Sequence, residues 1–140
     1  SKDENISKSN IDLNDDYTCV FVEYEKYKFA GVHLPLIDKK RENERKREKI
    51  LSKIKESDSK IICGDFNDTP ASYTYRTVKG DLTDGFRDCG SGFGYTFRQL
   101  KRIFRIDYII YSPDFKGVTY DSPNLDYSDH KPVVWLGYVN

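Results

Sequence analysis

Runs of β-branched and aromatic residues, separated by polar breaks, are the clearest pattern in the first part of the chain. The stretch YTCVFVEYE over 17–25 predicts a strand, and KFAGVHL over 28–34 predicts a second strand after a two-residue turn. Because the connection is that short, the two segments are expected to pair as an antiparallel hairpin.

Residues 38–56 carry mostly helix-forming side chains and predict one long helix. Ile50, Leu51 and Ile54 lie on one side of it, so its C-terminal half has an apolar stripe and its first half is expected to face solvent. Nine basic and five acidic residues give the helix a net charge of +4. That charge is typical of a water-facing helix with internal salt bridges, and a phosphate-binding surface is the alternative.

A buried strand, a polar turn and a helix start are predicted in SKIICGDFNDTPAS, residues 59–72. Thr69 suits the N-cap, and Pro70 suits the first helical position because its missing N–H would have no partner there. Residues 80–94 hold five of the nine glycines and predict a loop with one helical turn. Further strands are predicted over 95–99, 104–112, 117–122 and 131–139. This order of elements implies an α/β domain with a mixed β-sheet and flanking helices.

Composition limits the classes of protein to which the chain can belong. Its 140 residues suit one domain, and 23 basic residues balance 23 acidic ones, so no overall positive field attracts nucleic acid or an anionic membrane. Residues 1–16, with two lysines against five acids, predict a flexible leader before the folded part, 17–140. No apolar run approaches the roughly 20 residues that span a bilayer. The widely spaced Cys19, Cys63 and Cys89 indicate neither a disulfide framework nor a zinc site.

Asp65 and Asn67 lie on the strand-to-helix turn GDFND. Two residues apart on an extended chain, they project from the same side and aim a carboxylate and an amide at one point. Gly64 before them allows a close approach of backbone or ligand, and the following helix N-terminus favours an anion. The alternative is an Asx-turn, in which these side chains cap their own backbone.

The two histidines of the chain also lie at strand ends, His33 in GVHLP and His130 in YSDHKP. Asp107, inside the apolar stretch FRIDYII, needs a partner for its carboxylate, and a histidine is the obvious candidate. Asp129 and His130 point to opposite sides of an extended chain, so Asp129 suits a Mg²⁺ ligand and His130 a general base or phosphate donor. Each motif alone fits an ordinary polar turn. Together they form the arrangement that phosphoryl transfer at the ends of a sheet requires.

The motifs GVHLP, IICGDFNDTP, RIDYII and YSDHKPVV, in this order, resemble the endonuclease/exonuclease/phosphatase superfamily. Its members include pancreatic deoxyribonuclease, abasic-site endonucleases, inositol polyphosphate phosphatases and sphingomyelinases. The resemblance extends from residue 17 to the C-terminus and is strongest to bacterial members. It implies that residues 17–140 form the C-terminal half of the family's four-layer α/β sandwich.

The resemblance also implies roles for the motif residues. His33 is similar to the histidine that donates a hydrogen bond or proton toward the phosphate and the leaving oxygen, and Asp65 to the residue that aligns or deprotonates the attacking water. Asn67 is similar to the amide that holds a phosphate oxygen. The remaining implied matches are Asp107 as the acid that orients the second histidine, Asp129 as a metal ligand and His130 as the catalytic histidine.

A full domain of this family is about twice as long, and its N-terminal half supplies an Asn and the principal metal-binding Glu. Neither residue is visible here. The resemblance therefore implies a Mg²⁺- or Mn²⁺-dependent phosphoesterase, nuclease- or phosphatase-like, with low activity in this chain alone, because Asp129 by itself should bind Mg²⁺ weakly. The alternatives are a non-catalytic module that binds phosphate or nucleic acid, and a fragment whose exposed sheet face self-associates or binds the missing half.

The motifs do not specify a substrate, because family members hydrolyse DNA, RNA, inositol phosphates and sphingomyelin with the same central residues. Several aromatic and basic side chains near the predicted mouth suit base stacking or phosphate contact, with ordinary strand packing as the alternative. They are Tyr95, Phe97, Arg98, Lys101 and Arg102.

Overall fold

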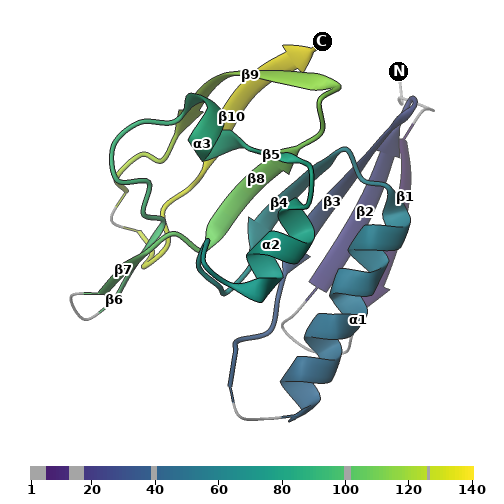
Figure 1. Ribbon diagram of the computed structural model, residues 1–140, viewed down its shortest axis with the longest axis horizontal. Helices are drawn as coiled ribbons and strands as arrows, with labels where there is room; N and C mark the ends of the chain where they lie inside the picture. The colour runs from purple at the N-terminus through teal and green to yellow at the C-terminus, as the bar shows by residue number, and fades with distance from the viewer. Residues whose placement is uncertain (1–5, 13–17, 39–40, 100–101, 126) are drawn as a thin grey trace.

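A six-stranded mixed sheet is the main feature of the computed structural model, which describes residues 6–12, 18–38, 41–99, 102–125 and 127–140 (Figure 1). The strand order is β1 (Ile6–Asp12), β2 (Thr18–Tyr24), β3 (Tyr27–His33), β4 (Ile61–Asp65), β8 (Asp107–Tyr111) and β5 (Thr83–Asp84). β3 and β4 pair in parallel, and the other neighbouring strands pair antiparallel. The predicted α/β architecture with a mixed sheet is confirmed, as is the hairpin of β2 and β3.

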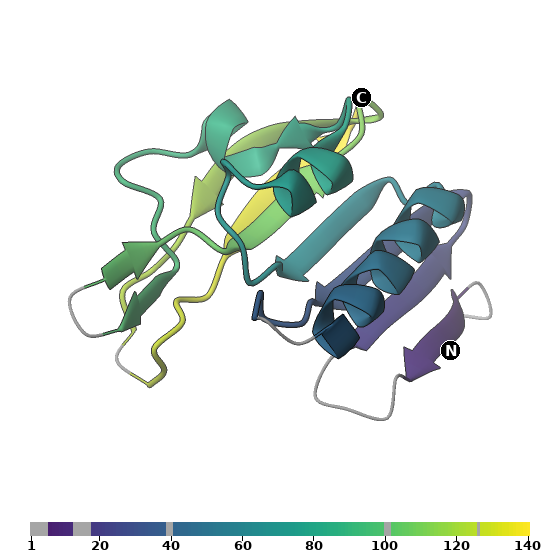
Figure 2. The same cartoon turned by 60° about the horizontal axis from the view of Figure 1, so that its bottom comes forward.

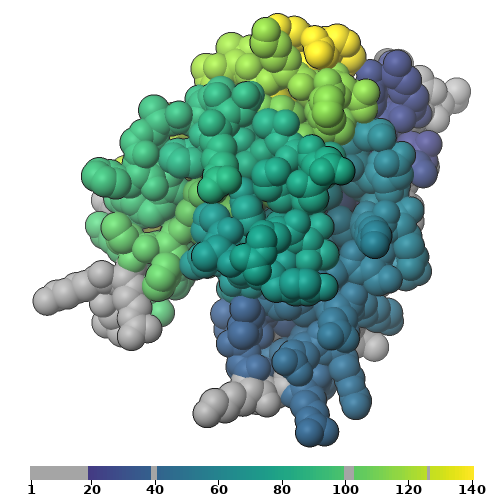
Figure 3. Space-filling model, in the orientation of Figure 1, coloured from purple at the N-terminus to yellow at the C-terminus, as the bar shows by residue number. Residues whose placement is uncertain are grey.

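Two helices, α1 (Arg41–Ser57) and α2 (Tyr73–Lys79), cover one face of this sheet (Figures 1 and 2). The space-filling view shows that the helices and the loops after them conceal most of that face (Figure 3). Ile50, Leu51 and Ile54 of α1 pack into one buried cluster with Val32 of β3 and Ile62 of β4. The apolar stripe predicted for the second half of α1 therefore forms the helix side of the core.

The segment 6–12 corrects the prediction of a flexible leader, because it forms β1 and pairs with β2 from Ile6↔Tyr24 to Asp12↔Thr18. Backbone pairing does not require apolar side chains, and the edge of β2 offers a row of N–H and C=O groups to a neighbouring strand. A polar composition therefore failed to predict this strand. The remainder of the predicted leader lies outside the described residues.

The helix expected to begin at Thr69 and Pro70 begins three residues later. Residues 69–72 form a turn in which the Ser72 N–H donates to the Thr69 carbonyl oxygen at 3.0 Å. Ser72 is the N-cap of α2, and its hydroxyl oxygen accepts a hydrogen bond from the Tyr75 N–H at 3.0 Å. Both Thr69 and Ser72 are favourable N-caps by residue type, and the turn over 69–72 places Ser72 at the start of the helix.

The C-terminal part adds the short helix α3 and two small sheets. Their elements are α3 (Gly85–Cys89), β6 (Phe97–Gln99), β7 (Arg102–Phe104), β9 (Phe115–Asp121) and β10 (Val134–Val139). The single strand predicted over 104–112 is divided, because β7 folds back on β6 as a hairpin while β8 joins the main sheet. The break falls at Arg105 and Ile106, directly before Asp107.

The two-stranded sheet of β9 and β10 exposes apolar side chains. Val134 and Leu136 of β10 are 55% and 59% exposed, and β10 pairs with β9 alone among the described strands. An unpaired strand edge with an exposed apolar face is a site for association with another chain. No described helix is both long enough and apolar enough to cross a membrane.

We expect the chain to self-associate weakly through β10. Replacing Leu136 with Lys adds a charge to the exposed face and should shift sedimentation equilibrium toward monomer without loss of folding, because an exposed substitution is nearly neutral for stability. Tyr127→Lys is the matched control, since Tyr127 is 94% exposed and lies outside β9 and β10. A wild-type chain that sediments as a monomer at high concentration would contradict this prediction.

Candidate active site

Three neighbouring strands bring their polar residues into one row. In the parallel pairing of β3 with β4, His33 lies opposite Asp65, and in the antiparallel pairing of β4 with β8, Asp65 lies opposite Asp107. Residues directly opposite each other project from the same face of a sheet. Ile62 of β4 packs against α1, so Asp65, three residues later, lies on the face away from the helices.

His130 completes this row from a separate segment just before β10. An isolated bridge pairs its backbone with Phe97, and the two rings lie 4.8 Å apart between centroids. His130 Nδ1 lies 3.0 and 3.2 Å from the two carboxylate oxygens of Asp107. The predicted pairing of Asp107 with a histidine is thus present in the structure.

The two imidazoles flank one carboxylate oxygen. The Nε2 atoms of His33 and His130 each lie 3.9 Å from Asp65 Oδ2. His130 therefore contacts Asp107 through Nδ1 and faces Asp65 with Nε2. A reacting group bound at this point can reach a carboxylate and two imidazoles at once.

Asp65 and Asn67 were predicted to project from the same side of an extended chain, but the chain is not extended at Asn67. Asn67 has φ 48°, in the left-handed region, and its N–H donates to Asp65 Oδ1 at 2.7 Å. The Asx-turn alternative is therefore correct for Asp65 Oδ1, while Asp65 Oδ2 faces the imidazoles. The Asn67 side-chain amide donates to the Leu34 carbonyl oxygen at 2.8 Å, which fixes the amide to the loop after β3.

The environment of Asp65 disfavours its ionised form. Burial raises the pKa of Asp65, and the neighbouring Asp107 carboxylate raises it further, while the Asn67 N–H and the two histidines act in the opposite direction. The net effect is a pKa above the ordinary value. A carboxylate with a raised pKa is a stronger base than an exposed one, so Asp65 suits proton abstraction.

Arg47 of α1 holds together the two loops that carry the site, although the sequence predicted this half of the helix to face solvent. Its guanidinium is buried and donates to the carbonyl oxygens of Pro35 and Phe66 and to Thr74 Oγ1. It also lies 3.6 Å from Asp68 Oδ2. Arg47 precedes Ile50 and Ile54 by three and seven residues, so the helical period already placed it on the apolar side.

Thr96 is a second residue that the sequence did not single out. It is fully buried, and its hydroxyl oxygen accepts hydrogen bonds from the N–H groups of Ile106 and Asp107, each at 3.1 Å. Its carbonyl oxygen accepts the Lys131 N–H at 2.7 Å. Thr96 thereby fixes the backbone at Asp107 and next to His130, the two members of the imidazole–carboxylate pair.

The residues predicted to bind metal or substrate are not all gathered here. Asp65, Asp107 and His130 offer ligand atoms within 4.8 Å of one another, and Asp129 is not a member of that group. Asp129 is exposed, and its Oδ1 lies 3.5 Å from the Ser128 hydroxyl. Of the aromatic and basic residues predicted near the mouth, Phe97 packs on His130, whereas Lys101 and the Arg102 side chain lie outside the described part.

Comparison with known proteins identifies the family. A model described as the Endonuclease/Exonuclease/phosphatase family matches residues 4–130, so the chain belongs to that family. This match confirms the resemblance seen in the motifs. No curated protein matches the sequence significantly.

Solved structures of low sequence identity share the fold. A mannosyl-6-phosphatase of Bacteroides thetaiotaomicron is 22% identical with a TM-score of 0.67, over 87% of this chain and 57% of that protein. An endonuclease/exonuclease/phosphatase of Bacteroides vulgatus is 20% identical with a TM-score of 0.65, over 98% and 66%. A 3′ phosphatase from Neisseria, solved with product DNA hairpin, is 21% identical with a TM-score of 0.63, over 95% and 70%. The chain thus spans less than two thirds of the first two relatives.

We expect Thr96→Val, which keeps the side-chain shape, to destabilise the fold strongly. The change leaves the N–H groups of Ile106 and Asp107 without their acceptor, at about 1–3 kcal/mol for each buried donor. Urea unfolding measures the loss. Thr119→Val on the exposed side of β9 is the control and should change stability by no more than about 0.5 kcal/mol. Equal urea unfolding midpoints for the two variants would show that the Thr96 hydroxyl does not stabilise the fold by accepting these two hydrogen bonds.

Proposed function

We propose that this chain carries the acid–base centre of a metal-dependent phosphoesterase. The observation that supports the proposal most directly is the position of Asp65 Oδ2, 3.9 Å from each of two imidazoles, one of which is hydrogen-bonded to Asp107. A carboxylate of raised pKa beside an oriented histidine is the combination that activates water and stabilises charge at phosphorus. Family membership supports the same reaction class.

In this proposal Asp65 aligns the attacking water and accepts its proton. His130, held through Nδ1 by Asp107, directs Nε2 toward the reacting phosphate, because the hydrogen bond fixes both the ring orientation and the tautomer. His33, on the other side of the carboxylate, donates toward the phosphate or the leaving oxygen. Asn67 holds the loop after β3 against the loop after β4, so that His33 keeps its position beside Asp65.

The donor set fits a divalent cation that is weakly held by protein. Carboxylate oxygens suit Mg²⁺ and Mn²⁺, and Mg²⁺ is commonly bound by one or two carboxylates together with substrate phosphate and water. We propose, from the family resemblance, that Asp129 holds the ion; the group of Asp65, Asp107 and His130 is the other described set of ligand atoms at this end of the sheet. Such an ion neutralises the negative charge that develops on the phosphate oxygens.

The proposed substrate class is the group that two solved relatives have in common in their descriptions. Two of the solved relatives are described as a mannosyl-6-phosphatase and a 3′ phosphatase, and their alcohol groups differ. A phosphate ester is common to both. We therefore propose hydrolysis of a phosphate ester.

The proposal predicts Mg²⁺-dependent hydrolysis of p-nitrophenyl phosphate esters, at a low rate in this chain because a single carboxylate holds Mg²⁺ weakly. His130→Ala should lower the rate about 10²- to 10⁴-fold, the usual contribution of a positioned acid or base. The rate of the wild type should rise with pH across the raised pKa of Asp65, because the base acts only when ionised. A loss of about tenfold or less would remove His130 from the reaction.

Two further variants separate catalysis from binding. Asp65→Ala should abolish turnover, whereas Asp81→Ala, an exposed acid outside the site, should leave it unchanged. Asp129→Ala should weaken the calorimetric signal of Mg²⁺ binding in the absence of substrate. Absence of turnover, with equal phosphate binding in the presence and absence of Mg²⁺, would instead favour a non-catalytic binding module.

Asp107 is expected to act through His130. Asp107→Asn and His130→Ala should therefore give losses that are not additive in the double variant, since the second change removes what the first one orients. A double-mutant cycle on the hydrolysis rate measures this coupling. Additive losses would mean that Asp107 contributes independently of the imidazole.

A further inference from the structure

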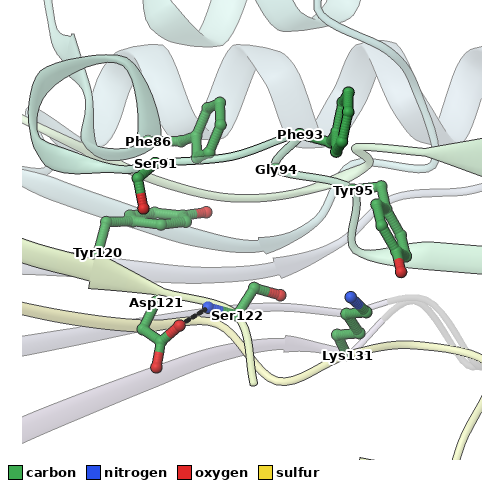
Figure 4. Close-up of a pocket in the computed structure, with 9 residues that line it drawn as sticks. All are labelled: Phe86, Ser91, Phe93, Gly94, Tyr95, Tyr120, Asp121, Ser122 and Lys131. Carbon is green, nitrogen blue, oxygen red and sulfur yellow. Dashed lines mark hydrogen bonds between the residues drawn. The ribbon is translucent and has the colours of Figure 1, made fainter. Parts of the chain in front are cut away.

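A small pocket lies beside the candidate site, between the loop after α3 and the C-terminal end of β9 (Figure 4). Its volume is about 160 Å³, and its walls include Phe86, Phe93, Tyr95 and Tyr120. Lys131, which directly follows His130, lines the opposite side. The pocket and the candidate active site are thus connected through one short backbone segment.

Two hydroxyl groups of this pocket are buried without a hydrogen-bond partner among the described residues. They belong to Tyr120, which is 7% exposed, and to Ser122. Figure 4 shows the Tyr120 hydroxyl and the Lys131 amine pointing toward the space that the walls enclose. Buried hydroxyls are nearly always paired, so two orphaned hydroxyls on one pocket point to a ligand that pairs them.

The charge of the pocket favours a neutral ligand. Lys131 and Asp121 are the charged residues among its described lining, and their charges cancel. The Lys131 ammonium lies 3.6 Å from the centroid of the Tyr95 ring, which fixes it at the rim. A phosphate dianion would meet one cation and one carboxylate here, so it would not recover the cost of leaving water.

The walls favour a ring. Phe86 packs edge-on against Tyr120, with centroids 5.7 Å apart, and Phe93 and Tyr95 stand on the other side. Aromatic faces bind the apolar faces of a ring, while hydroxyls, which both donate and accept, bind hydroxyls at its edge. The pocket is large enough for one such ring and too small for a chain of them.

We propose that this pocket binds a neutral six-membered ring that carries hydroxyl groups, such as a pyranoside. The Tyr120 and Ser122 hydroxyls and the Lys131 amine bind its oxygens, and Phe86 and Tyr95 contact its faces. The proposal goes beyond the proposed hydrolysis and does not depend on it, because binding of an unphosphorylated ring requires neither metal nor turnover.

Titration of the isotope-labelled chain with methyl pyranosides, without metal, tests the proposal by amide NMR shifts. We expect saturable shifts centred on Tyr95, Tyr120, Ser122 and Lys131 for at least one pyranoside, with a Kd of about millimolar order. Tyr120→Phe should weaken this binding about 3- to 10-fold, the effect of one hydrogen bond. It should not lower the thermal midpoint, because the lost hydroxyl has no partner within the protein.

Tyr73→Phe is the matched control, since Tyr73 is exposed on α2 outside the pocket, and it should leave binding unchanged. Inorganic phosphate is the competing probe. The proposal is overturned if no pyranoside gives saturable shifts, if phosphate alone shifts the Tyr120 and Ser122 amides, which lie away from His130 in the chain, or if Tyr120→Phe binds as tightly as the wild type. Hydrolysis measured on the same variants reports separately on the proposed function.

Discussion

The pairing of β4 between β3 and β8 is the constraint on which the candidate site depends. The register of these three strands alone places His33, Asp65 and Asp107 side by side. A shift of one residue in either pairing would move one of these side chains to the face that packs against the helices. Gly64 allows this pairing, because it has φ 136° and a Cβ at this position would overlap the carbonyl oxygen of Val32.

Buried charges fix the loops that extend from this row of strands. Arg105, two residues before Asp107, forms a two-point ion pair with the buried Asp84, at 2.8 and 2.9 Å, and the Tyr75 hydroxyl donates to Asp84 at 2.6 Å. Although burial alone raises the pKa of Asp84, the hydrogen bonds from Arg105 and Tyr75 lower it below the ordinary value. Removing one partner of such a pair costs about 3–5 kcal/mol, whereas the intact pair adds little net stability. Its role is therefore to hold one geometry, here at the entry to Asp107.

The hydrogen bonds of Thr96 join the candidate site to the neighbouring pocket. Thr96 fixes Asp107 through its hydroxyl and Lys131 through its carbonyl oxygen, so the backbone that orients the acid–histidine pair also positions one wall of the pocket. In a family whose members use one set of central residues on many esters, the loops around those residues are where specificity differs. The loop between α3 and β6 lines the pocket beside the candidate site in this chain.

Local patterns in the sequence predicted the long helix, over 38–56 against the observed 41–57, the hairpin of β2 and β3, and the motifs that carry the two histidines and three of the acids. Helical periodicity, β-branched runs and short motifs extend over a few residues, so they can be recognised in the sequence before the fold is known. The structure decided what depends on distant partners: the strand at 6–12, the carbonyl oxygens to which Arg47 donates, and the burial of Thr96. Those features follow from strand register and from hydrogen bonds between segments far apart in the chain, which no local pattern encodes.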